Sequence, residues 1–229
     1  MKGFISTLIM CTAALVAADT WGGSYSLGPA KTNIIEMTTT LTLELRHLLR
    51  LACFSFGQFL FWVSHMPGIS NGTGDLVQTT LEQWPDNSWC GAGKGEWCVR
   101  ASVFGWFGQR DGPSAVVKPT DAVTMNYKLG SNKMTWTQTV TINNKVVSTL
   151  TSDSGPYMKG WGTGTECNGG CTGTISAQKY TNTVITLDAA DPNFGKTAAS
   201  AGGATATGLT SEQGGKIWKI ATINVPKMG

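Results

Sequence analysis

The sequence predicts an all-β protein built as a two-sheet antiparallel sandwich or jelly roll, and three observations support this. Several runs alternate apolar and polar residues with period two, as strands with one buried face do. Turn residues separate these runs, and helix formers are scarce outside one segment. The 229 residues are enough for a single domain with a sizeable core.

The first eighteen residues have the layout of a secretory signal peptide. A positive start at Met1 and Lys2 precedes an apolar run at residues 3–16, and Val16-Ala17-Ala18 offers small residues for cleavage. The run is too short to cross a bilayer. We therefore expect residues 19–229 to form one secreted, extracellular β-sandwich domain with no membrane attachment after cleavage.

The expected strands follow in order along the chain. Alternation predicts strands at 76–84, 97–104, 123–129 and 134–142, and Asn143-Asn144 predicts a hairpin turn into a strand at 145–151. Further strands are expected at 172–178, 180–188 and 217–225. The glycine-rich stretches 152–170 and 189–215 are expected to be loops, the second a long mobile connection.

Residues 43–66 are anomalous in composition. They contain both histidines of the chain, His47 and His65, together with two arginines and the unpaired Cys53. The segment fits a short amphipathic helix followed by a buried strand, or a translation artefact such as a retained intron. A membrane span is a poor fit, because Arg50 interrupts the apolar run. The sequence leaves the helix and the artefact open.

Cys11 lies in the predicted signal peptide, and the last four cysteines of the chain predict two local disulfides. Cys90 with Cys98, and Cys167 with Cys171, each enclose a short glycine-containing stretch, as expected in an oxidising compartment. A zinc site would instead want Cys-x2-Cys pairs or histidines, and neither accompanies these cysteines. Asn71 begins an Asn-Gly-Thr sequence and is a predicted N-glycosylation site.

Composition excludes several classes of function. A net charge of +3, dispersed along the chain, does not indicate a nucleic-acid surface. With histidine confined to residues 43–66, serine and cysteine hydrolase mechanisms lack a base. We expect no metal or organic cofactor, although a surface Ca²⁺ on Asp/Asn loops stays open. We expect a monomer whose partner is an extracellular polysaccharide or protein substrate.

Several motifs resemble one known family. Trp21-Gly22-Gly23 and segment 33–38 (NIIEMT) are similar to its opening strands, and segment 75–79 (DLVQT) to the strand with its catalytic glutamine. Segments 117–124 and 136–151 resemble its central strand and hairpin. The chain thus resembles the concanavalin A-like jelly rolls of secreted fungal proteins, and among them most the glutamic peptidases, or eqolisins.

The resemblance bears on the roles of three residues. Gln78 would be the catalytic glutamine and oxyanion donor. The family's catalytic glutamate follows an alanine on a later strand, where this chain has Ser176-Ala177-Gln178. A neutral amide cannot act as a general base, so Gln178 would break the peptidase mechanism. Glu166 is the nearest other candidate, and we expect no protein cleavage at acid pH.

Glycoside hydrolysis would need two carboxylates about 5 to 10 Å apart. Glu82 shares a predicted strand face with Gln78, but four residues of strand separate them by roughly 13 Å. Glu96, Asp111 and Glu166 are further candidates. The sequence does not pair any two of them.

Tryptophans in the middle of the chain indicate a glycan surface. Sugars stack on aromatic rings, and a concave sheet bearing Trp136, Gln138, Gln78 and Thr80 would suit an extended glycan. The alternative is that the rings fill the core, which we favour for Trp136. Trp89 and Trp161 lie beside turns and are expected to be exposed. Gln138, an amide in an apolar row, must face a groove or bond to backbone.

The preferred interpretation is a secreted protein that binds or acts on extracellular glycans through its concave sheet face. Two alternatives remain: a glutamic-type acid endopeptidase or its non-catalytic relative, and a non-catalytic secreted effector or cell-wall interaction protein.

Overall fold

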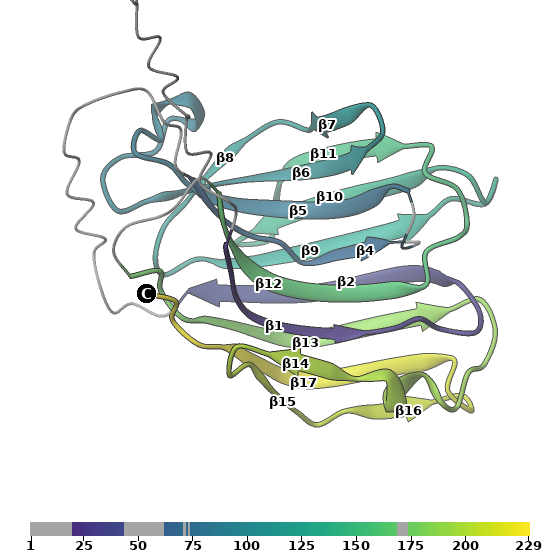
Figure 1. Cartoon of the computed structure of the whole chain (residues 1–229). Coiled ribbons are helices and arrows are strands. Elements are labelled where there is room, and N and C mark those ends of the chain that lie inside the picture. The colour runs from purple at the N-terminus through teal and green to yellow at the C-terminus, as the bar shows by residue number, and fades with distance from the viewer. Residues whose placement is uncertain (1–19, 44–61, 71, 73, 169–173) are drawn as a thin grey trace, which may run out of the picture.

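The computed structural model describes residues 20–43, 62–70, 72, 74–168 and 174–229. These residues form two stacked antiparallel β-sheets (Figure 1). In the described part of the chain the helical elements are two short 3₁₀ turns, η1 (Ser88–Cys90) and η2 (Phe194–Thr197). No helix among the described residues is long and apolar enough to span a membrane.

The first sheet has nine strands. They are β1 (Thr20–Leu27), β3 (Trp62–His65), β4 (Gly68–Ser70), β5 (Leu76–Gln83), β6 (Trp97–Gly105), β7 (Gly108–Asp111), β8 (Ala115–Val117), β12 (Gly160–Asn168) and β14 (Ala199–Ala201). Their spatial order is β14-β1-β12-β3-β5-β6-β7; β4 also pairs with β12 and β5, and β8 with β6. The edge strand β7 is short and exposes Gln109, Arg110 and Asp111.

The second sheet has eight strands. They are β2 (Ile34–Leu43), β9 (Ala122–Leu129), β10 (Trp136–Ile142), β11 (Lys145–Ser152), β13 (Gln178–Leu187), β15 (Thr205–Thr207), β16 (Thr210–Glu212) and β17 (Ile217–Val225). Their order is β11-β10-β9-β2-β13-β17-β15, with β16 on β17. Two stacked antiparallel sheets in one domain confirm the predicted all-β jelly-roll class.

The core lies between the two sheets and follows the predicted alternation. On β10, Trp136, Gln138, Val140 and Ile142 are buried, while the threonines between them face outward or are half-buried. Removing these apolar side chains from water is the main force that holds the sheets together. The predicted hairpin is confirmed: Asn143 and Asn144 both have positive φ, as a tight two-residue turn between β10 and β11 requires.

The prediction that two glycine-rich segments form loops is wrong. Segment 152–170 contains β12, which pairs with β1 on one side and with β3 and β4 on the other. Segment 189–215 is not one mobile connection, because it contains η2, β14, β15 and β16. Phe194 of η2 is buried edge-on against Trp218, with ring centroids 6.0 Å apart.

The prediction of a strand at 172–178 is also wrong for residues 174–178, the part that the structure describes. Ile175 makes a single bridge to Met228, and β13 begins only at Gln178. The signal peptide at 1–18, Asn71 and Cys171 lie outside the described residues, so these remain predictions. Of the anomalous segment, residues 44–61 lie outside the described residues, while β3 pairs with both β12 and β5.

Candidate functional site

The candidate site lies on the outer face of the nine-stranded sheet, the face turned away from the eight-stranded sheet. On β5, Val77 and Leu81 point into the core, so the alternating Gln78, Thr80 and Glu82 belong to the outer face. The structure thus places these three predicted site residues on one strand face, as the sequence indicated.

A hollow of about 440 Å³ lies on this face across β1, β12, β4 and β5. Its floor is made largely of glycines: Gly160, Gly162 and Gly164 of β12, and Gly68 of β4. We call these four residues the glycine floor. Because glycine carries no side chain, the strands are recessed here, and a ligand can approach the backbone closely.

Gln78 is the long polar side chain beside the glycine floor. It pairs across the sheet with Gly68 of β4 and with Ser102 of β6, and Gly68 pairs in turn with Gly162. Only 4% of Gln78 is exposed, and its Oε1 has no hydrogen-bond partner; the buried Oγ of Ser102 has none either. A buried acceptor without a partner is costly, and Gln78 lines the hollow, so its Oε1 is suited to accept a hydrogen bond from a ligand.

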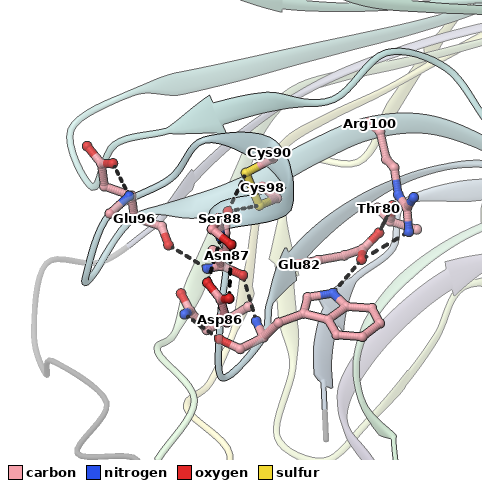
Figure 2. The surroundings of a disulfide bond; sticks show 12 residues. Thr80, Glu82, Asp86, Asn87, Ser88, Cys90, Glu96, Cys98 and Arg100 are labelled. Atoms are coloured by element: carbon pink, nitrogen blue, oxygen red, sulfur yellow. Dashed lines mark hydrogen bonds and ion pairs between the residues drawn. A yellow bond between two sulfur atoms is a disulfide. The ribbon is translucent and has the colours of Figure 1, made fainter. Parts of the chain in front are cut away.

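Glu82 is the centre of a polar cluster on the same face, which we call the Glu82 cluster (Thr80, Glu82, Trp84, Arg100 and Asp111). The Thr80 hydroxyl donates to Glu82 Oε1 at 2.6 Å, and the Trp84 indole donates to Oε2 at 2.7 Å. Arg100 donates to both oxygens, from Nε at 2.9 Å and Nη2 at 3.2 Å (Figure 2). Glu82 is fully buried, and each of its oxygens already accepts two hydrogen bonds.

Arg100 links the cluster to a second carboxylate and to an aromatic side chain. Its Nη1 lies 2.8 Å from Asp111 Oδ2, and its guanidinium lies 4.8 Å from the ring centre of Trp89. Trp89 is 40% exposed, as expected, and contacts Trp84 edge-on. Both carboxylates, Glu82 and Asp111, are therefore engaged by Arg100.

A disulfide holds the loop that carries Trp89. Cys90 and Cys98 are bonded, as predicted, and Asn87 accepts from the Trp84 backbone N–H and donates to the Glu96 carbonyl (Figure 2). Asp86 accepts two hydrogen bonds from Ser88, which lower the pKa of its carboxyl. The Glu96 carboxylate accepts from the Gly93 backbone N–H, so it stabilises the turn rather than the site. Cys167 is also disulfide-bonded.

Four predicted site residues have side chains buried between the two sheets rather than exposed on the outer face. Gln178 points into the core, where it donates to Thr165 and accepts from Tyr180, so it cannot stand opposite Gln78. Trp136 and Gln138 are buried on the other sheet, where the Gln138 amide donates to the Ser102 carbonyl at 2.8 Å. The preferred interpretation of Trp136 as a core residue is confirmed, and so is the alternative that Gln138 bonds to backbone. The expectation that they share a concave face with Gln78 and Thr80 is wrong. So is the expected exposure of Trp161, which is 2% exposed and packs edge-on against Tyr25.

Glu166 does lie on the outer face, at the end of the hollow near Trp21. Its backbone pairs with Trp21 and with Ser64, and Ser64 pairs with Glu82. Glu166 and Glu82 are therefore two strand spacings apart, about 10 Å between Cα atoms. Beside Gln78, however, the neighbouring positions on β4 and β12 are glycines, so those positions bring no carboxylate to it.

The sequence interpretation missed the glycine floor and Arg100. One signal was present: Gly160, Gly162 and Gly164 recur with period two, alternating with Trp161, Thr163 and Thr165. Among the described residues, no group of three His, Cys, Asp or Glu side chains could hold a metal ion.

No protein-family model and no curated protein matches the chain. Among solved structures it is similar to an alginate lyase in complex with an alginate trisaccharide, at 11% identity over 92% of this chain and 73% of that chain, with a TM-score of 0.30. It is also similar to a Bacillus licheniformis β-glucanase (11% identity, 92% and 69% covered, TM-score 0.26) and to a peanut lectin (8% identity, 95% of both chains covered, TM-score 0.26). Similarities this weak carry no argument about function.

Proposed function

We propose that this chain is a secreted protein that binds extracellular glycans through the hollow on the outer face of the nine-stranded sheet. The observation that carries the proposal is the glycine floor with the buried, unpartnered amide oxygen of Gln78 at its side. A flat sugar ring can lie on bare backbone, and its hydroxyls can donate to an acceptor held in place.

Other features of the hollow support a saccharide ligand. Its volume lies in the range of small-ligand sites. Trp21, which is 63% exposed, borders it and offers a ring on which a sugar can stack. Ser24 and Ser26 of β1 add hydroxyl groups along the opposite side from Gln78.

The geometry favours binding over hydrolysis. Glycoside cleavage needs an acid and a base or nucleophile on two carboxylates across the scissile bond. Glu82 has its oxygens fully occupied, and Asp111 is paired with Arg100. The acid-peptidase alternative needs a carboxylate near Gln78, and Gln178 does not supply it. A non-catalytic effector or wall protein would use the same surface for binding alone.

Isothermal titration calorimetry of the purified full-length chain against linear oligosaccharides tests the proposal. We expect saturable binding that weakens strongly in Gln78→Ala and Trp21→Ala. Tyr157→Ala is the matched control, because Tyr157 is equally exposed but does not line the hollow. Absence of binding to any saccharide, or equal weakening by the control, would contradict the proposal.

Incubation with denatured casein at acid pH tests the peptidase alternative. We expect no digestion. Digestion that disappears in Gln78→Ala would favour a glutamic-type peptidase.

A further inference from the structure

We infer that the hollow accepts an uncharged saccharide chain and discriminates against chains of uronic acid or sulfated sugars. The inference rests on the proposed glycan-binding function and narrows the substrate class of that site. It follows from the charges around the hollow and from the hydrogen-bonding role of its buried acceptor, Gln78 Oε1.

No described residue that lines the hollow carries a charge. The lining consists of glycines, serines, aromatic and aliphatic side chains, Thr163 and Gln78. A carboxylate or sulfate bound there would lose part of its hydration without a lysine or arginine to replace it. Burying an unpaired charge costs much more than burying a neutral hydroxyl.

The cation on the neighbouring strand is already engaged. The guanidinium of Arg100 bonds both oxygens of Glu82, forms an ion pair with Asp111, and stacks on Trp89. Lys159, next to the floor in sequence, donates its ammonium group to the Lys31 carbonyl at 3.2 Å. Recruiting Arg100 to an anionic sugar would leave the buried Glu82 without its counter-charge, which is strongly unfavourable.

The buried acceptor oxygen of Gln78 adds a second reason. Gln78 lines the hollow, and its Oε1 has no partner in the described part of the chain. A sugar hydroxyl can donate a hydrogen bond to Gln78 Oε1. An ionised carboxylate or a sulfate only accepts, so its oxygens would face the lone pairs of the amide oxygen.

Calorimetry with two sets of hexasaccharides tests the inference directly. One set is neutral, built from glucose, mannose or xylose, and the other is built from uronic acids. We expect at least one neutral chain to bind at least about tenfold more tightly than any uronic chain. A uronic chain that binds as tightly would overturn the inference and leave the proposed function standing. Failure of both sets would overturn the proposed function itself.

A matched pair of substitutions locates the selectivity in the hollow. Gly162→Lys and Gly162→Met add side chains of similar length, and only the lysine brings a charge. We expect both to weaken neutral-chain binding, and only Gly162→Lys to raise the affinity for uronic chains relative to Gly162→Met. Ser26→Lys and Ser26→Met repeat the comparison at the exposed position that pairs with Gly162 on β1. Equal uronic affinity within both pairs would contradict the inference.

Discussion

Gln78 and Gly162 pair with the same residue, Gly68, from opposite sides. This arrangement sets a long amide side chain beside a run of bare backbone on the outer face of the nine-stranded sheet. The recess exists because β12 carries glycines where another outward-facing strand would carry side chains. Its depth should therefore depend directly on those glycine positions.

Filling the recess should weaken binding strongly while leaving the fold intact. The Gly162 backbone does not have positive φ, and an added Cβ would meet Ser26 Cβ at 3.3 Å, so Gly162→Val should be accommodated after a small shift. We expect glycan affinity to fall by about tenfold or more, with thermal stability changed by no more than about 1 kcal/mol. Calorimetry and thermal unfolding measure the two quantities. Gly93→Val, away from the hollow, is the control and should keep full affinity.

Removing the charge of Glu82 should destabilise the protein. Glu82→Gln leaves Arg100 with only Asp111 as an ion-pair partner. It also places an amide nitrogen, which is itself a donor, where a carboxylate oxygen accepted two hydrogen bonds. We expect a loss of about 2 to 4 kcal/mol in the free energy of unfolding, measured by urea denaturation. Glu36→Gln is the control, because Glu36 forms a largely exposed ion pair with Lys128. It should cost less than about 1 kcal/mol. Equal losses in the two variants would contradict this account of the Glu82 cluster.

The Cys90–Cys98 bond should stabilise both the fold and the position of Trp89. The cysteines are eight residues apart, so the paired Cys90→Ser and Cys98→Ser variant should lose about 2.5 kcal/mol from the smaller entropy of the cross-linked unfolded chain. Denaturant unfolding checks the magnitude. Fluorescence should also report greater solvent contact of Trp89, because the loop that places it against Arg100 is released. An unchanged midpoint would show that hydrogen bonds from Asn87 alone hold the loop.

Alkaline pH should destabilise the protein through two buried tyrosines. Burial raises the pKa of Tyr127 and of Tyr180 above the ordinary value of 10.0. The folded state thus holds both phenolic protons more tightly than the unfolded state. Their contribution is complete below about pH 10 and is lost as pH rises above it. Urea denaturation across this range should show falling stability, and Tyr127→Phe should reduce the slope. A slope unchanged in that variant would exclude Tyr127 as a source.

Strands with alternating apolar residues could be predicted from sequence, and those without a continuous apolar signal could not. On β5 and β10 the alternation identifies the strand and the residues that share a face. β12 escaped because its glycines carry no hydrophobic signal and weaken the intrinsic preference for a strand. Its position depends on pairing with β1, β3 and β4, which are far away in sequence.

The candidate site was predictable only in part for a related reason. Alternation shows that Gln78 and Glu82 share a side, and the structure agrees. It does not show which sheet a strand joins, so a glycan face shared by Trp136, Gln138 and Gln78 stayed open in the sequence, although the first two lie on the opposite sheet. A local motif likewise could not show that Gln178 points into the core. Those assignments depend on sheet topology, which short sequence motifs do not encode.

The short edge strand β7 has a consequence for behaviour in solution. Unpaired backbone groups at a sheet edge can recruit a strand from another molecule, and charged side chains there oppose this. Arg110 and Asp111 occupy that edge, with Gln109 beside them. A second copy that extended the sheet at this edge would have to dehydrate those charges. Charged side chains at β7 therefore protect the protein against edge-to-edge aggregation on this side.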